Sequence, residues 1–352
     1  ATNMYNVAIG HNTGAAVTTG TNNTLIGGLA GDALTTGDSN IAMGSQALSS
    51  DTKGNKSVAI GRDALLLQNF TSATNAYNVA VGDNAGSAIT TGANNTFLGG
   101  LAGDATNDGV GNTAVGYLAL SANCGNDNTA VGIGALGLAT GAQNTAIGYY
   151  AMGQTDASGT DNTTLGYAAG FALTSGSNNV FLGHDAGRTG SPGGNQTTGN
   201  GSIILGDDNI GDAYIQVDWT VASDARDKTD FTALDLGLDF VKDLKPVTYK
   251  WDKRSKYGDK YAEDYDLNAQ TPDGTHKEDW LDIGFKAQEV EALEIAAGYK
   301  IADKTNLTTS LTSDGKQMGL QYSKFVPILV KAIQEQQALI ESLTARIETL
   351  EG

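Results

Sequence analysis

The sequence predicts a mainly β protein. We expect a Gly- and Asn-rich β-solenoid resembling a β-roll, followed by a small α+β domain and a C-terminal coiled-coil helix. Three observations support this. A short phrase ending in Gly recurs at near-constant spacing, the composition changes abruptly near Ser223, and an apolar heptad marks the last residues. We expect the solenoid over residues 1–206, a junction over 207–222, and a second domain over 223–352, with its coiled coil at 326–350.

The repeated phrase, written NVAIG, NTAVG or NTAIG, defines the solenoid. Successive phrases are 16 to 18 residues apart, except for gaps of 21 and 23. A longer stretch that begins at Tyr5 recurs 72 residues later at Tyr77, as expected from duplication of several coils. The phrases end at Gly10, Gly27, Gly44, Gly61, Gly82, Gly99, Gly116, Gly132, Gly148, Gly166, Gly183 and Gly206.

Such short units must stack, because a strand of four or five residues cannot bury its apolar face alone. Gly is too frequent for helix interiors, whereas Gly and Asn suit turns with positive φ. We expect the apolar residue before each Gly to form one inward column, from Ile9 to Leu205, and the Asn side chains to stack in ladders. One thin column is marginal for a single chain, so several chains are expected to pack around an axis.

Composition separates the two regions and excludes some partners. Residues 1–222 hold 39 of the 47 glycines, four Lys or Arg and no Glu, and their net charge is −11. The remaining residues contribute −7 to the total of −18. Such an acidic chain would repel nucleic acid, which we exclude as a partner. No apolar run reaches the roughly 18 residues that membrane insertion needs.

Two features of the chain concern processing. Cys124 is the single cysteine, so no intrachain disulfide can form. The sequence starts at Ala1, without Met or a signal-like segment, and the first repeat follows at once. We therefore expect the chain to be a piece of a longer polypeptide.

The phrase SVAIG at Ser57 to Gly61, with its NTAIG and NVAVG relatives, resembles the head repeats of trimeric bacterial surface adhesins. The resemblance covers about residues 5–206 and implies left-handed parallel β-rolls assembled as trimers. The coils here are longer than is usual in those heads, so handedness and coil path stay open.

The second region begins with SDARDK, Ser223 to Lys228, and continues with LDLGLDFVKDLKPVTYKW and IGFKAQEVEAL. With the terminal YSKFVPILVKAIQEQQALIESL, this series resembles the C-terminal intramolecular chaperone of phage tail spikes and fibres, including endosialidases. The resemblance implies a domain that assembles three chains and then cuts itself off before the serine. It places a catalytic dyad at Ser223 and Lys228, with Asp224 and Arg226 in support, and the scissile bond between Ala222 and Ser223.

The chemistry agrees with this assignment. A serine hydroxyl needs a proton acceptor, and a neutral lysine serves without histidine. Because a free lysine has a pKa of about 10.4, Lys228 would have to be desolvated or placed beside Arg226 to reach about 7 to 8. Folding and trimerisation would supply that environment. The alternative is that SDARDK is a solvated turn with an Asp N-cap.

Local patterns predict an α+β domain. Leu234, Leu238, Val241 and Leu244 recur at helical spacing before Pro246. Residues 247–251 and 281–285 alternate as strands, a short helix follows around 289–293, and the polar stretch 254–279 is an exposed insertion.

The terminal heptad places Val326, Ile333, Ile340 and Ile347 at a, and Leu329, Gln336, Leu343 and Leu350 at d. Ile at a with Leu at d favours dimers in isolated peptides. The upstream domains favour a trimer, and we give them precedence. The alternative is a single amphipathic helix packed on its own domain.

Other chemical sites are not indicated. His11, His184 and His276 lie in no metal-ligand spacing, so we expect neither a metal nor a cofactor. The stretch GDDNIGD at 206–212 does not fit a calcium loop and is better explained as a polar turn. GGLAGDA lacks the lysine of a phosphate loop. A paired-carboxylate glycosidase is poorly supported.

The resemblance implies the distal part of a phage tail fibre, a homotrimer assembled in the host cytoplasm and located in the virion. It would bind a host-surface glycan or protein receptor, and other virion tail proteins through a missing N-terminal part. There are two alternatives: a tailspike depolymerase that acts on a host surface polysaccharide, and a non-cleaving trimerisation chaperone on a bacterial adhesin. Candidate receptor contacts are Tyr117, Tyr149, Tyr150, Tyr167 and Phe171.

Overall fold

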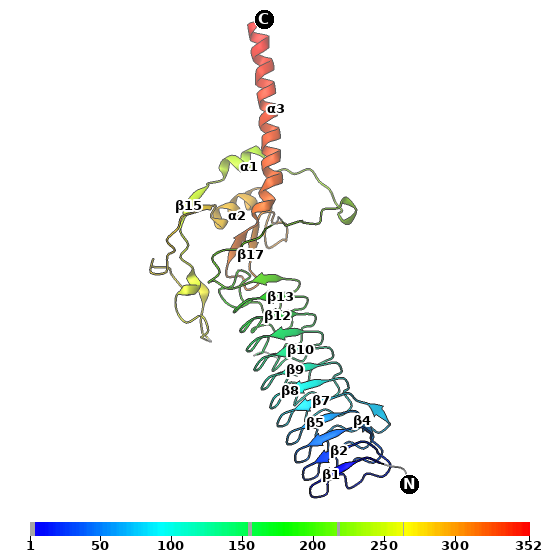
Figure 1. Cartoon of the computed structure of the whole chain (residues 1–352). Helices are drawn as coiled ribbons and strands as arrows, with labels where there is room; N and C mark the ends of the chain where they lie inside the picture. Colours follow the sequence, from blue (N-terminus) through cyan, green and yellow to red (C-terminus); the bar gives the residue numbers. More distant parts are fainter. Residues whose placement is uncertain (1–3, 154–156, 217–218, 263) are drawn as a thin grey trace. The chain divides into compact units, whose positions relative to one another are not determined.

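The computed structural model describes residues 4–153, 157–216, 219–262 and 264–352 (Figure 1). Contacts divide the chain into two units, Ala1–Asn209 and Ile210–Gly352. The predicted fold class is confirmed: a β-solenoid is followed by an α+β region and a long C-terminal helix.

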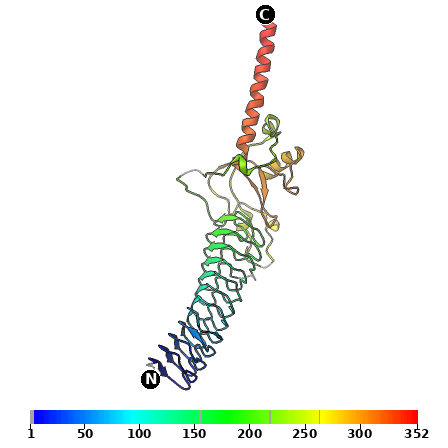
Figure 2. The ribbon, with the colours of Figure 1, turned by 90° about the vertical axis from the view of Figure 1, so that its right-hand side faces the viewer.

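The first unit is a β-solenoid whose coils each contribute one three-residue strand to a parallel sheet (Figures 1 and 2). Each strand aligns with its neighbour residue for residue, as in the pairing of Ala130 with Ala114 and Ala146. Within the described residues the twelve strands of this sheet are β1 (Val7–Ile9), β2 (Thr24–Ile26), β3 (Ile41–Met43), β5 (Val58–Ile60), β7 (Val79–Val81), β8 (Thr96–Leu98), β9 (Thr113–Val115), β10 (Thr129–Val131), β11 (Thr145–Ile147), β12 (Thr163–Leu165), β13 (Val180–Leu182) and β14 (Ile203–Leu205).

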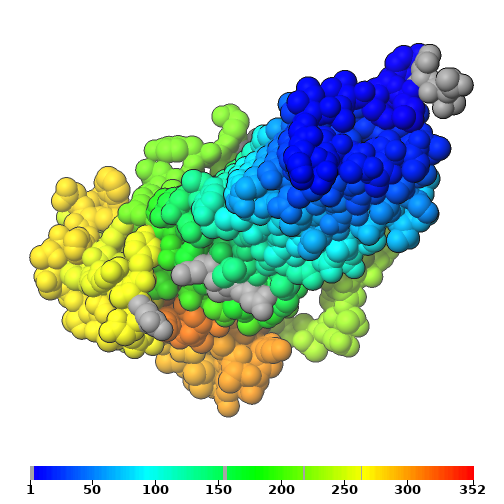
Figure 3. Space-filling model, turned by 90° about the horizontal axis from the view of Figure 1, so that it is seen from below, coloured from blue at the N-terminus to red at the C-terminus, as the bar shows by residue number. Residues whose placement is uncertain are grey.

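The longer coil between Gly61 and Gly82 carries part of a second, shorter sheet. There β4 (Gly54–Asn55) pairs in parallel with β6 (Thr74–Asn75). The space-filling view toward the N-terminal coils shows successive coils packed against one another (Figure 3).

The solenoid interior is formed by the central residue of each strand, which corrects the expected inward column. Ala8 excepted, these central residues are buried, whereas Ile9, Leu98 and Leu165 just before the repeat Gly are 59%, 48% and 49% exposed. Side chains alternate along a strand, so the two residues that flank a buried centre both face outward. The prediction was therefore wrong by one residue, which reverses the face of the sheet.

Two alternative ways of filling the interior recur along the coils. The position four residues after the repeat Gly has positive φ and is occupied either by Gly or by a large residue such as Leu65 or Met152. Where it is Gly, a large residue from the strand centre takes the space. A Cβ built on Gly103 would lie 2.5 Å from the Phe97 ring, and Gly86 meets the same ring at 2.8 Å. The duplicated stretches share this arrangement.

The predicted Asn ladder is present within the chain. Asn112 accepts a hydrogen bond from the Asn128 backbone N–H at 2.9 Å, and its own amide nitrogen donates to the Gly125 carbonyl at 3.0 Å. The same pattern links Asn128 to Asn144 and continues to Asn179. Buried turn groups thus find partners in the neighbouring coil, as buried polar groups require.

The second unit is small and mixed. Its elements are η1 (Ala225–Asp227), α1 (Leu238–Asp243), β15 (Val247–Tyr249), η2 (Arg254–Lys256), η3 (Leu267–Ala269), β16 (Asp282–Gly284), α2 (Ala287–Ala296), β17 (Thr309–Leu311), β18 (Met318–Leu320), η4 (Tyr322–Lys324) and α3 (Phe325–Glu351). The predicted strands pair as the antiparallel β15 and β16, and both predicted helices form. The β17–β18 hairpin was not predicted, because its short strands lack a clear alternation.

The core of this unit consists of Leu236, Phe240, Val290, Phe325 and Ile328. Helix α3 contributes the last two from its first turns, together with the buried Ala332. All residues from 336 onward are exposed in the single chain. Among the described residues, no helix is both long and apolar enough to cross a membrane.

Candidate functional site

The predicted dyad lies on either side of a short turn. Asp224 caps the 3-10 turn η1, accepting the Arg226 backbone N–H at 2.9 Å, and Lys228 closes the turn by donating its backbone N–H to the Ala225 carbonyl. The chain thereby folds back on itself. Lys228 Nζ lies 2.6 Å from Ser223 Oγ and 3.4 Å from the Ser223 carbonyl oxygen.

The two neighbouring charged residues pair with each other. An Arg226 Nη2 to Asp224 Oδ2 contact of 2.6 Å forms an exposed ion pair. Hydrogen bonds from the Arg226 side chain and backbone lower the pKa of Asp224, and the Asp224 carboxylate raises the pKa of Arg226. The turn thus has the Asp N-cap of the alternative interpretation and also brings Ser223 and Lys228 together.

The site is open to solvent in a single chain. All residues from 219 to 233 are exposed, including Ser223 and Lys228. Three large apolar side chains beside the dyad share this exposure: Trp219, Val221 and Phe231 are each more than 70% exposed. The desolvation expected for Lys228 is therefore not provided by its own chain.

Three of the five candidate receptor residues share one column on the solenoid, and the other two lie at different positions of the repeat. Tyr149 and Tyr167 each follow a repeat Gly, are about half exposed and stack at 5.2 Å with an interplanar angle of 7°. Tyr117 lies in the same column on an earlier coil. Tyr150, two residues after Gly148, and Phe171, five residues after Gly166, are half-buried and meet edge to face at 6.4 Å. Arg188 covers the Phe171 ring at 4.4 Å.

The column of residues that directly follow a repeat Gly continues into a cluster of side chains that sequence analysis missed. His184 stacks on Tyr167 at 4.9 Å, and Asp207 occupies the corresponding position on the next coil. Asp185 lies beside both, and one ligating atom from each of the three residues falls within 4.8 Å of the others. The available sequence signal was that His184 and Asp207 each directly follow a repeat Gly. This equivalence predicts a contact only when neighbouring coils are known to stack in register.

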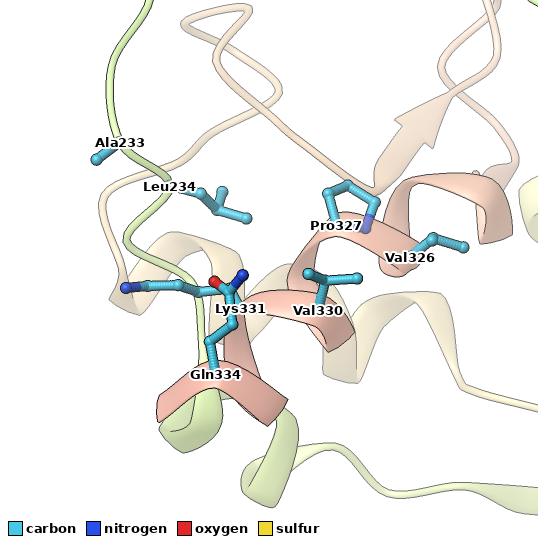
Figure 4. A pocket seen from close by; sticks show the side chains of 7 residues that line it. All are labelled: Ala233, Leu234, Val326, Pro327, Val330, Lys331 and Gln334. Carbon is cyan, nitrogen blue, oxygen red and sulfur yellow. The ribbon is translucent and has the colours of Figure 1, made fainter. Parts of the chain in front are cut away.

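A groove opens at the base of α3 (Figure 4). Ala233 and Leu234 form one side, and Val326, Pro327 and Val330 form the helix side, with Lys331 and Gln334 at its end. Val326 and Val330 remain 59% and 49% exposed. The beginning of the predicted heptad therefore borders an apolar surface that its own chain leaves open.

Comparison with known proteins identifies the family of part of the second unit. Residues 223–299 match the Peptidase_S74 family model, described as the chaperone of endosialidase. No curated protein and no solved structure matches the chain. The chain therefore carries a chaperone-of-endosialidase domain, which follows the β-solenoid in the sequence. This domain belongs to a self-cleaving family that is typical of phage tail fibres and tailspikes.

Proposed function

From this domain we propose that the chain is the distal part of a phage tail fibre. Its trimeric solenoid binds the host surface, and its C-terminal domain drives trimerisation and then cleaves the Ala222–Ser223 bond. The observation that carries the proposal is the 2.6 Å contact between Lys228 Nζ and Ser223 Oγ. The family match begins at that same serine.

The cleavage proceeds through the hydroxyl of the residue that follows the scissile bond. Ser223 Oγ attacks the Ala222 carbonyl carbon while the neutral Lys228 amine accepts the hydroxyl proton. The peptide C–N bond then breaks, the Ser223 nitrogen takes a proton to become an amine, and Ala222 is left as an ester on Oγ. Water hydrolyses the ester and releases residues 223–352 with a free N-terminal Ser223.

Assembly controls this reaction, because a single chain leaves the dyad in water. An exposed lysine is almost entirely protonated at neutral pH and cannot accept the proton. Trp219, Val221 and Phe231, which are close to Ser223 in sequence, offer exposed apolar surface for neighbouring chains to cover. Burial favours the neutral form of a lysine, so cleavage follows trimer formation.

Exposed apolar surfaces in both units support a trimer. The outer face of the solenoid sheet presents Ile9, Met43, Leu98 and Leu165, and the heptad of α3 presents Ile333 and its a-position equivalents. Monomeric proteins rarely expose continuous apolar surface of this kind. Three copies packed around one axis would cover both surfaces.

Receptor contact falls on the stacked Tyr149 and Tyr167 side chains. Tyrosine supplies a rigid flat surface with a hydroxyl group at its edge, which suits the rings of a surface glycan. Adsorption of the purified protein to host cells measures this contact, and undiminished adsorption of a Tyr149→Ala, Tyr167→Ala double variant would exclude it.

Denaturing electrophoresis with N-terminal sequencing tests self-cleavage. We expect assembled wild type to give fragments of residues 1–222 and 223–352. The smaller fragment should begin at Ser223 and be absent from Ser223→Ala and Lys228→Ala. Lys242→Ala, which changes an exposed lysine of α1 paired with Asp239, is the control and should cleave normally.

Sedimentation equilibrium on the same samples separates folding from chemistry. The two dyad variants should remain trimers of about three times the 36.2 kDa chain mass. A full-length band that persists in assembled wild type would refute cleavage and leave a non-cleaving trimerisation chaperone.

A further inference from the structure

The cluster of His184, Asp185 and Asp207 joins the last two coils of the solenoid. His184 and Asp185 follow β13, and Asp207 follows β14 after the longest gap in the repeat, 23 residues. His184 Nδ1 lies 3.1 Å from Asp185 Oδ2 and 3.6 Å from Asp207 Oδ2. The cluster lies entirely within the solenoid unit.

These separations match the edges of a zinc coordination polyhedron. Zinc binds His nitrogen and carboxylate oxygen at about 2.0 to 2.2 Å, which gives tetrahedral ligand-to-ligand distances of about 3.3 to 3.6 Å. The two measured nitrogen-to-oxygen distances fall at or close to that range. One ligand atom from each of the three residues lies within 4.8 Å of the others.

The three side chains are also held by their surroundings. The Asp185 and Asp207 side chains are only 1% and 4% exposed. Arg188 Nη1 lies 2.7 Å from the other oxygen of Asp185. Asn209 donates its backbone N–H to Asp207 Oδ1 at 2.9 Å and its side-chain Nδ2–H to Asp207 Oδ2 at 2.6 Å. Stacking on Tyr167 orients the His184 ring. Such outer contacts fix the orientation of metal ligands in known sites.

Charge favours a cation at this position. Asp185 and Asp207 bring two buried carboxylates together, with Arg188 as the neighbouring cation. Two buried carboxylates facing one imidazole nitrogen form a mixed N and O donor set, which suits zinc and similar borderline divalent ions. Calcium prefers sites made of six or more oxygen ligands.

We propose that His184, Asp185 and Asp207 bind a zinc-class divalent cation, with water in the fourth position, and that this ion links the last two coils. The site would close the solenoid where its coil is longest. It is independent of the dyad and of the proposed tail-fibre function.

Isothermal titration of EDTA-treated full-length protein with ZnCl2 tests the site. We expect one zinc per chain, at least tenfold weaker binding in His184→Ala and in the isosteric Asp207→Asn, and no comparable response to CaCl2. His11→Ala is the matched control, because His11 follows Gly10 as His184 follows Gly183, and its zinc affinity should equal that of wild type.

Circular dichroism and sedimentation check that each variant is folded and assembled. Absence of zinc binding by folded wild type would overturn the proposal and leave His184 as an ion-pair partner of the two aspartates. Equal loss in His11→Ala would also overturn it, because binding would then be adventitious. X-ray absorption at the zinc edge should show one nitrogen and two carboxylate ligands.

Discussion

The two units of the chain satisfy their buried groups in different ways. The solenoid encloses a continuous interior in which strand centres, Leu or Met at the left-handed position, and the Asn ladder are almost completely buried. The C-terminal unit has only five buried apolar residues in its core cluster and exposes Trp280, Ile283 and most of the α3 heptad. The solenoid therefore completes its interior within a single chain, whereas the C-terminal unit buries only part of its apolar surface.

This difference follows from how far apart in the sequence the contacting residues lie. In a solenoid each coil meets the next along the sequence, so local repeats suffice to build the interior. The C-terminal unit leaves the apolar heptad of α3 exposed in the single chain. In the proposed trimer its stability should therefore depend on protomer concentration.

The largest expected effect is on assembly through the α3 seam. Ile340 occupies an a position and is exposed in the single chain, so Ile340→Lys would place a charge in the seam of the trimer. We expect sedimentation equilibrium to return the monomer mass, and self-cleavage to stop. Ala338→Lys, on the opposite side of the same helix, should remain trimeric. A trimer that tolerates Ile340→Lys would show that α3 is not the assembly surface.

A smaller effect is expected inside the solenoid from a matched pair of glycines. Gly103 and Gly201 have φ of +63° and +67°, but an added Cβ meets the Phe97 ring at Gly103 and nothing within 4 Å at Gly201. The left-handed backbone costs about 1–2 kcal/mol in both alanine variants. Overpacking should add about 1–3 kcal/mol in Gly103→Ala alone. Thermal melts by circular dichroism measure the difference, and equal melting temperatures would contradict the tight interior.

The smallest expected effect is a pH dependence confined to the C-terminal unit. Glu294 of α2 is buried, which by itself raises its pKa, but hydrogen bonds from Thr309 and Thr308 outweigh burial and lower it. Its Oε1 accepts the Thr308 hydroxyl at 2.7 Å, and its Oε2 accepts the Thr309 hydroxyl. The stabilisation is therefore present above the unfolded pKa of about 4.3 and is lost as pH falls through the lower folded pKa.

Glu294→Gln should lower the melting temperature at pH 7, and the gap from wild type should narrow below about pH 4. All three tryptophans lie at positions 219, 251 and 280, so tryptophan fluorescence reports unfolding of this unit alone. Glu291→Gln on the same helix is the control and should change little. A gap that stays constant with pH would assign the effect to lost packing.

The sequence alone determined the repeat, the parallel stacking of coils and the division of the chain. Gly at a fixed position favours turns because it adopts positive φ without steric cost, and Asn at another position bridges adjacent coils through its side chain. The family resemblance carried by SDARDK paired Ser223 with Lys228, and in the structure Lys228 Nζ lies 2.6 Å from Ser223 Oγ across one turn. The short strands β17 and β18 and the start of α1 at Leu238 lacked a comparable local signal.

Tertiary structure decided which face of each strand is inside. In phrases such as NVAVG an apolar residue stands on each side of the central Ala, so hydrophobicity pointed to the wrong column. Packing inside the solenoid buries the central position, whether Ala, Leu or Phe. It also decided that His184 and Asp207 meet, because the separation between coils, rather than between sequence positions, sets their distance. The single chain leaves Ser223 and Lys228 exposed, so the burial expected for Lys228 is not a property of this chain's own fold.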